Sequence, residues 1–183
     1  MKELRILGLS GSLRKASYNT ALIKALTRLA PAGMVITLFP SMDQLPLFNP
    51  DRENQGLAVV SELKTALYQA DGLLIASPEY AHGVSSVLKT ALDWLVSGAE
   101  FPAKPVALLN ASPRARHALA ALREVIVTMS GIIIEPACVA VPLLGSQLDA
   151  DGIVQNTELS QTLVQAMERF RDGIVRRQRP NPP

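Results

Sequence analysis

The sequence predicts an α/β protein built on a doubly wound, five-stranded parallel sheet of order 2-1-3-4-5, with helices on both faces. Two observations lead to this prediction. Short apolar runs alternate about five times with amphipathic stretches along the 183 residues, and that alternation is typical of parallel sheets whose crossovers are helices. The apolar runs are also nearly continuous, as expected for strands buried on both faces.

The first half of the chain contains two predicted strand–helix units. An apolar run at 4–9 ends at a serine cluster, which predicts a buried strand, and apolar residues at helical spacing then predict a helix over 19–29. A second strand is predicted over 34–39, because Pro40 cannot continue it. A proline-rich loop leads to a predicted helix over 57–70.

The second half repeats the pattern. A strand over 72–76 and a helix over 84–96 are followed by a strand over 105–110 and a helix over 117–129. The β-branched run 132–141 contains a fifth strand, which Pro136 should break.

A closing helix over 156–175 completes the pattern. We therefore expect one domain over 1–176 and a flexible, basic, proline-rich tail over 177–183.

Composition excludes several classes of protein. The net charge of +2 is too small to indicate binding to nucleic acid or to an anionic membrane, and no apolar run approaches the length of a membrane span. The single cysteine, Cys138, cannot form an internal disulfide, and the first residues lack the apolar core of a signal peptide. A cytoplasmic protein is expected.

The loop after the first strand, "SGSLRKASYNT", predicts a phosphate site. It combines hydroxyl, amide and cationic side chains with the start of a helix, whose free N–H groups favour an anion. The candidate ligands are Ser10, Ser12, Arg14, Ser17, Asn19 and Thr20. A simple helix cap is the alternative, but a cap needs only one such residue. No Walker A motif, G-x-G-x-x-G fingerprint or cysteine nucleophile occurs in this loop.

The loop after the third strand, "SPEYAHG", is the second candidate. Because ligands of doubly wound sheets bind beyond the carboxyl ends of the strands, the backbone of this turn could meet the polar edge of a planar ring. Its candidates are Pro78, Glu79, Tyr80, His82 and Gly83. An ordinary polar turn is the alternative.

Together the two loops resemble a known family. G-S-L-R-x-x-S-x-N at 11–19, P-E-Y at 78–80 and L-K-x-A-x-D-W at 88–94 are similar to the motifs of the NADPH-dependent FMN reductases. These are flavodoxin-like flavoproteins that include quinone and chromate reductases. The similarity extends over about 4–143, and "LPLFNPD" at 45–51 also resembles the family's loop after the second strand.

The resemblance implies noncovalent FMN, with its phosphate on the first loop and its isoalloxazine on the third-strand loop and near Ser112. NADPH or NADH would reduce the flavin, which would then reduce a quinone, free flavin or similar small acceptor in a ping-pong cycle. The flavin carries the chemistry, so no catalytic side chain is expected.

Two other functions stay open. One is an FMN-binding electron-transfer module without its own NAD(P)H turnover, although such modules are commonly strongly acidic. The other is a binding or regulatory protein that no longer holds flavin. The family also implies a homodimer or homotetramer, to whose interface Leu45, Leu47 and Phe48 could contribute.

The loop after the fourth strand departs from the family's pattern. No glycine occurs between Gly98 and Gly131, and Pro113, Arg114, Arg116 and His117 stand where a glycine-rich segment is usual. Either this loop stands away from the flavin, or its arginines contact an anion such as the 2′-phosphate of NADPH.

Three further expectations concern side chains outside these loops. With two histidines and one cysteine in the chain, no metal site is expected. Trp94 and Cys138 are interpreted as core residues, and Lys89 and Asp93 as an intrahelical ion pair.

Overall fold

The computed structural model describes residues 3–178. Six strands form the main sheet: β1 (Leu4–Ser10), β2 (Met34–Leu38), β3 (Gly72–Ala76), β6 (Pro105–Asn110), β7 (Ile132–Ile133) and β8 (Val139–Ala140). A separate two-stranded hairpin consists of β4 (Glu79–Tyr80) and β5 (Gly83–Val84). The helices are α1 (Tyr18–Leu29), α2 (Ala58–Gln69), α3 (Ser86–Leu95), α4 (Arg116–Thr128), α5 (Ala150–Gln155) and α6 (Thr157–Gln178).

The main sheet is parallel throughout and has the order β2-β1-β3-β6-β7, with β8 also paired to β6. The predicted order 2-1-3-4-5 is therefore confirmed, with β6 as its fourth strand. The fifth strand is split, as the sequence predicts, because a 3₁₀ turn over Glu135–Ala137 contains Pro136. β7 consequently pairs with the beginning of β6, and β8 pairs with its end.

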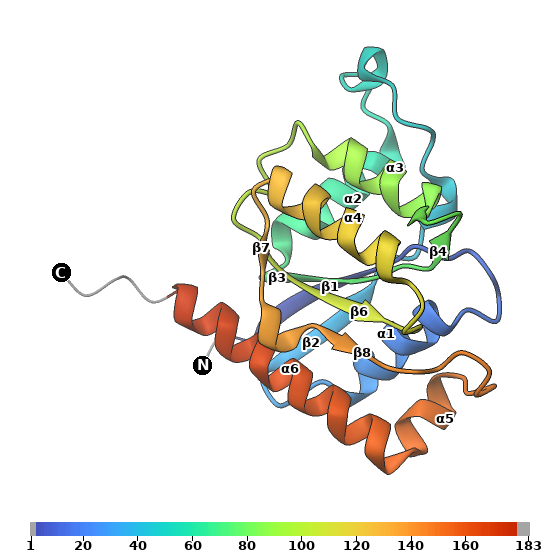
Figure 1. Ribbon diagram of the computed structural model, residues 1–183. Coiled ribbons are helices and arrows are strands. Elements are labelled where there is room, and N and C mark those ends of the chain that lie inside the picture. The colour runs from blue at the N-terminus through green and yellow to red at the C-terminus, as the bar shows by residue number, and fades with distance from the viewer. Residues whose placement is uncertain (1–2, 179–183) are drawn as a thin grey trace.

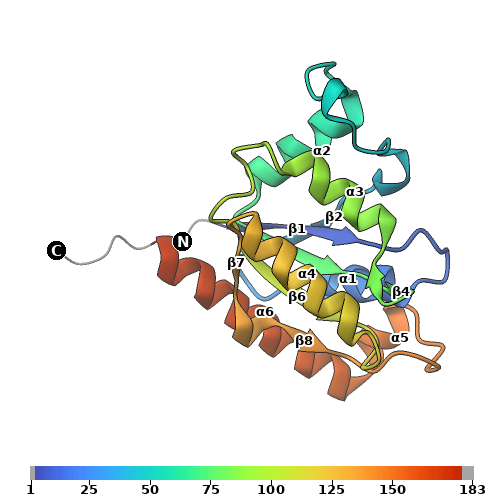
Figure 2. The ribbon, with the colours of Figure 1, turned by 45° about the horizontal axis from the view of Figure 1, so that its top comes forward.

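Both faces of the sheet are buried. The helices α1, α5 and α6 cover one face, and α2, α3 and α4 cover the other (Figures 1 and 2). Successive residues of β3 alternate between the two layers: Leu73 and Ile75 pack with α2–α4, whereas Leu74 and Ala76 pack with α1 and α6. This two-sided burial explains why the strands read as continuous apolar runs.

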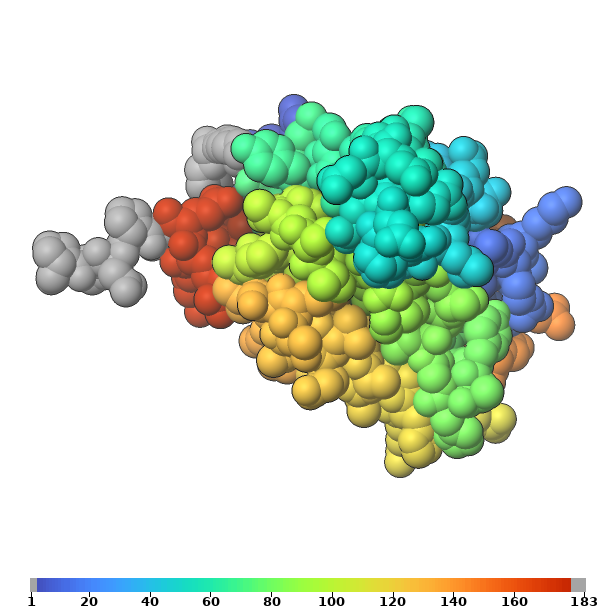
Figure 3. Space-filling model, turned by 90° about the horizontal axis from the view of Figure 1, so that it is seen from above, coloured from blue at the N-terminus to red at the C-terminus, as the bar shows by residue number. Residues whose placement is uncertain are grey.

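The segment 40–57 projects from the layer of α2 and α3 and comes toward the viewer in Figure 3. Trp94 fastens its base: the indole N–H donates to the carbonyl of Pro46 at 2.8 Å, and the ring contacts Phe48 edge to face. Trp94 is 1% exposed, which confirms its interpretation as a core residue. Leu47 beside it is 79% exposed. Lys89 and Asp93 form the predicted ion pair on α3.

The carboxyl-terminal region differs from the prediction in two ways. α6 continues through Gln178, so the first two residues of the predicted tail are helical, and the remaining tail, 179–183, lies outside the described residues. The short helix α5 was not predicted, because six residues that include Gly152 show too little periodicity to be recognised. Within residues 3–178, none of the helices has the length and apolar character to cross a membrane.

Candidate functional site

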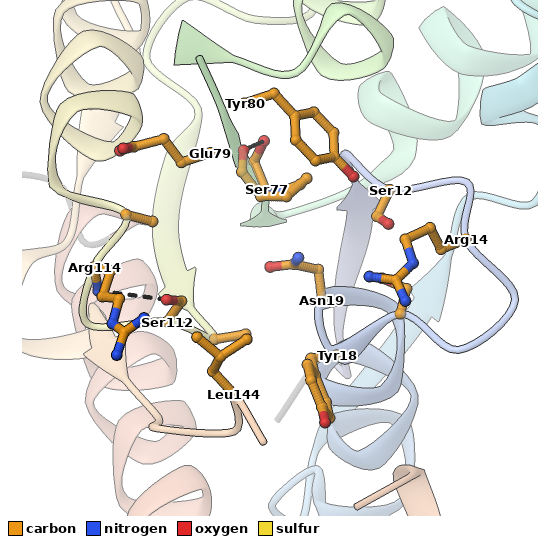
Figure 4. A pocket seen from close by; sticks show the side chains of 14 residues that line it. Ser12, Arg14, Tyr18, Asn19, Ser77, Glu79, Tyr80, Ser112, Arg114 and Leu144 are labelled. Atoms are coloured by element: carbon orange, nitrogen blue, oxygen red, sulfur yellow. Dashed lines mark hydrogen bonds between the residues drawn. The ribbon is translucent and has the colours of Figure 1, made fainter. Parts of the chain in front are cut away.

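A cavity of about 290 Å³ opens at the carboxyl ends of β1, β3 and β6, where the sequence predicts the site (Figure 4). We call it the cofactor cavity. Three loops and one further residue line it: Ser12, Arg14, Ser17, Tyr18 and Asn19 after β1; Ser77, Pro78, Glu79 and Tyr80 after β3; Ala111, Ser112, Arg114 and Ala115 after β6; and Leu144.

Two glycines determine how the first loop lies. A Cβ atom on Gly8 would approach Ile23 Cγ2 to 2.6 Å, so glycine allows α1 to pack closely on β1. A Cβ atom on Gly11 would lie 2.6 Å from the hydroxyl oxygens of Ser77 and Ser85. The loop after β1 therefore packs directly against the loop after β3 where both enter the cavity.

Hydroxyl groups of the first loop also bind one another. Ser10 Oγ and Thr20 Oγ1 share a hydrogen bond of 2.7 Å, and the N–H of Ser12 donates to Ser10 Oγ at 3.4 Å. Ser17 caps α1, since its Oγ accepts from the N–H of Thr20 at 3.2 Å. Ser10 does not line the cofactor cavity, and Thr20 lines a neighbouring one. These two hydroxyls tie the loop to α1.

The side chains that face the cavity from this loop are polar and largely buried. Ser12, Ser17 and Asn19 are 9%, 7% and 8% exposed. Asn19 points into the cavity (Figure 4), and its buried Oδ1 has no hydrogen-bond partner among the described residues. A buried polar atom without a partner costs about 1–3 kcal/mol, so the side chain is suited to a polar ligand. Arg14 adds a positive charge at the exposed rim.

The loop after β3 forms the opposite side through Pro78, Glu79 and Tyr80. It doubles back as the β4–β5 hairpin, in which Gly83 pairs with Tyr80 and the turn residues Ala81 and His82 have φ of 47° and 60°. Neither His82 nor Gly83 lines the cavity. The His82 ring instead packs against His117, with the ring centroids 4.2 Å apart.

Glu79 joins two of the walls. Its carboxylate points toward α4 (Figure 4), where Oε2 accepts from the N–H of Ala118 at 2.8 Å. Ala118 lies in the first turn of α4, whose own cap position is Ala115 and provides no side-chain acceptor. Glu79 therefore satisfies a free N–H and places a negative charge at the favourable end of α4.

The glycine-poor loop after β6 reaches the cavity through small residues. Asn110 Oδ1 accepts from the N–H of Ser112 at 2.9 Å, and this turn presents Ala111, Ser112 and Ala115 to the cavity. Arg114 lines the cavity as well, whereas the exposed Arg116 does not. The loop thus does not stand clear of the cavity, because its alanine and serine side chains are small enough to line it.

The structure brings most of the predicted site residues together. Eight of them line the cofactor cavity: Ser12, Arg14, Ser17, Asn19, Pro78, Glu79, Tyr80 and Ser112. Sequence reasoning missed Tyr18, Ser77, Ala115 and Leu144. Tyr18 and Ser77 lie within the two recognised loops and could have been included, whereas nothing local marks Leu144.

No metal centre is found at these loops. Between residues 3 and 178, no group of three or more His, Cys, Asp or Glu side chains is arranged to hold a metal ion.

The sequence matches the family model described as NADPH-dependent FMN reductase over residues 4–143. The chain belongs to that family. The resemblance inferred from the two loops is thereby confirmed, and the match begins and ends where the sequence predicts.

Relatives and solved structures agree with this membership. An NAD(P)H-dependent FMN reductase of Pseudomonas aeruginosa is 40% identical over 113 residues, which are 60% of this chain and 60% of that protein. This chain thus spans less than two thirds of that relative. A 2-hydroxy-1,4-benzoquinone reductase of a Burkholderia species is 30% identical over 91% of this chain and 94% of its own.

The solved structure of FerB, a flavoenzyme NAD(P)H:(acceptor) oxidoreductase from Paracoccus denitrificans, superposes with a TM-score of 0.79. It is 26% identical and covers 94% of this chain and 98% of its own.

Proposed function

We propose that this protein binds FMN noncovalently in the cofactor cavity and catalyses the oxidation of NADPH or NADH by a small acceptor such as a quinone or free flavin. One observation supports this most strongly. The buried hydroxyls of Ser12 and Ser17 and the amide of Asn19 surround the start of α1 and line the same cavity as Pro78 and Tyr80. The hydroxyls and the amide Nδ2 can donate to a phosphate, and the buried, unpartnered Oδ1 of Asn19 can accept from a hydroxyl of the ligand. This arrangement suits a ligand with a phosphate at one end and a planar ring at the other.

The residues present fit the two ends of FMN. Ser12, Arg14, Ser17 and Asn19, together with the free N–H groups of α1, would hold the phosphate, because a phosphate monoester offers many acceptor sites and two negative charges. Pro78, Tyr80 and Ser112 would flank the ring. Ser10 and Thr20 would contribute indirectly by fixing the loop.

FMN, when bound, supplies the redox chemistry by taking a hydride from the nicotinamide and passing electrons to the acceptor. The protein's contribution is to position both. Glu79 is the one carboxylate lining the cofactor cavity among residues 3–178, and its Oε2 is already engaged by Ala118. This supports a site in which no side chain serves as acid or base.

Apolar side chains at the rim favour a small organic acceptor. Tyr80 and Leu144 line the cavity yet are 53% and 56% exposed. An aromatic or quinonoid molecule could approach across them and bury part of this surface. The names of the relatives, an FMN reductase and a benzoquinone reductase, point to the same class of acceptor.

The first experiment is the visible spectrum of the purified protein, followed by heat release and identification of the pigment. A yellow protein that releases FMN, and that oxidises NADPH when a quinone is added, would support the proposal. A protein that holds FMN without oxidising NADPH or NADH would be an electron-transfer module. A protein that takes up no added FMN would overturn the proposal.

We also propose that the protein is cytoplasmic and forms a homodimer or homotetramer. The single half-buried cysteine suits a reducing compartment. The exposed Leu47 on the projecting segment 40–57 offers an apolar contact for a second subunit. Cell fractionation tests the location. Size-exclusion chromatography with light scattering tests the assembly, and a monomer at micromolar concentration would contradict it.

A further inference from the structure

We propose that a second cavity, beside the cofactor cavity, binds the 2′-phosphorylated adenosine end of NADPH and so favours NADPH over NADH; this inference rests on the proposed function. The second cavity has a volume of about 550 Å³ and lies between the start of α1 and the loop that leads into α5. It is lined by Arg14, Lys15, Ala16, Ser17, Tyr18, Thr20, Ala21, Lys24, Gln147, Leu148, Asp149, Ala150 and Asp151.

The second cavity adjoins the proposed phosphate end of the cofactor cavity. Arg14, Ser17 and Tyr18 line both. A dinucleotide whose nicotinamide lies over the flavin ring, and which runs parallel to FMN, would bring its adenosine past the FMN phosphate. That direction leads from Pro78 and Tyr80, across Ser17, into the second cavity.

The positive charges of the second cavity are available to an anion. Of the two lining carboxylates, Asp149 caps α5 by accepting from the N–H of Gly152 at 2.9 Å, and Asp151 is paired with Arg28. By contrast, no ion pair within residues 3–178 engages Lys15 or Lys24. Both lysines are exposed enough to reach a phosphate without first losing a partner.

The second cavity also offers a surface for a purine. Tyr18 is held in place because its phenolic oxygen accepts from the N–H of Gln147 at 3.2 Å, which ties α1 to the loop before α5. Its ring and the half-buried Leu148 supply apolar surface on two sides. Nucleotide bases commonly stack on such aromatic faces.

The arginines of the loop after β6 are the other basic group that could bind the 2′-phosphate, and they do not line the second cavity. Arg114 lines the cofactor cavity itself, and Arg116 lines neither cavity. If the 2′-phosphate bound on that side, Arg116 would be its exposed partner. The two basic groups can therefore be tested against each other.

The experiment measures, by isothermal titration calorimetry, the binding of adenosine 2′,5′-bisphosphate and of 5′-AMP to the FMN-loaded protein. We expect the bisphosphate to bind more tightly than 5′-AMP. The double variant K15Q/K24Q should bind the bisphosphate about tenfold more weakly, since each charged hydrogen bond from a lysine to the phosphate contributes to the binding free energy. R116Q should change the affinity less than about twofold. The KM for NADPH should rise in K15Q/K24Q more than the KM for NADH.

Retained FMN absorbance shows that each variant is folded. Two results would overturn the inference: equal affinities for the bisphosphate and 5′-AMP, or a loss of bisphosphate affinity in R116Q but not in K15Q/K24Q. If the same protein still oxidised NADPH, the proposed function would stand. A wild-type protein that neither holds FMN nor oxidises NADPH would overturn both.

Discussion

Two walls of the cofactor cavity are built in contrasting ways. The loop after β1 is stabilised largely by hydrogen bonds to nearby residues: Ser10 binds Thr20, and Ser17 caps the following helix. The loop after β6 has local hydrogen bonds to Asn110 and Ser112, but its helix takes an N-terminal acceptor from Glu79, which belongs to a different loop. The hydrogen bonds cited for the first wall thus join residues at most 10 positions apart, whereas the second wall also depends on a hydrogen bond across 39 positions.

The largest expected effect comes from breaking the wall after β1. The variant Gly11→Val places methyl groups where a Cβ alone would lie 2.6 Å from Ser77 and Ser85. We expect a loss of about 1–3 kcal/mol in the free energy of unfolding and no measurable FMN binding. Chemical denaturation and FMN titration measure the two effects.

Gly33 provides the control, because nothing lies within 4 Å of its would-be Cβ and its φ is +80°. Asparagine tolerates that backbone conformation, so the variant Gly33→Asn should bind FMN normally. If Gly11→Val also bound FMN normally, the close contact between the two loops would be irrelevant to the site.

The wall after β6 is tested by Glu79→Ala. Removing the carboxylate leaves the N–H of Ala118 unsatisfied, and losing a helix cap costs about 0.5–2 kcal/mol. FMN affinity should fall as the wall loosens. Glu79→Gln keeps an acceptor oxygen and should recover most of the lost stability and FMN affinity. As a control, Glu62→Ala on the exposed face of α2 should change neither appreciably. Equal stability of the Ala and Gln variants would show that the acceptor oxygen of Glu79 does not stabilise the wall after β6.

Asn19→Leu separates stability from binding within the wall after β1. Because Asn19 Oδ1 is buried without a partner, replacing it with an apolar side chain should raise the stability of the FMN-free protein by about 1 kcal/mol. FMN affinity should fall about tenfold, since the hydrogen bond that Asn19 Nδ2 would donate to the charged phosphate is lost. Thermal unfolding with and without FMN measures both. A parallel loss of stability and affinity would show that Asn19 is structural.

The smallest expected effect on stability concerns Cys138, which lies behind the wall after β6. Its Sγ accepts a hydrogen bond from the N–H of Leu108 at 3.4 Å. Burial raises the pKa of the Cys138 thiol. Because the pKa is higher in the folded state, the stabilising contribution is complete below the pKa of a free thiol and is lost as the pH rises through the folded value.

We therefore expect the stability difference between wild type and Cys138→Ala to shrink at alkaline pH. Alkylation of this single cysteine should also be slower in the native protein than in the denaturant-unfolded chain. Equal alkylation rates would mean that the sheet beneath this wall opens readily.

The site was predictable where its residues are neighbours in the chain. Ser12, Arg14, Ser17 and Asn19 lie within one loop, and the apolar run before them and the amphipathic helix after them place that loop at the end of a strand. Pro78, Glu79 and Tyr80 were found for the same reason. Thr20 belongs to the same sequence pattern but is directed elsewhere, which the pattern could not show.

The amino-acid sequence by itself determined the alternation of strands and helices, the position of the cofactor loops and the break in the fifth strand at Pro136, because each follows from local periodicity and backbone chemistry. Only the tertiary structure decided that Glu79 caps α4, that Leu144 reaches the cofactor cavity, and that Tyr18 meets Gln147 beside a second cavity. These contacts join residues between 39 and 129 positions apart. They arise from the packing of helices on the sheet, which no local pattern records.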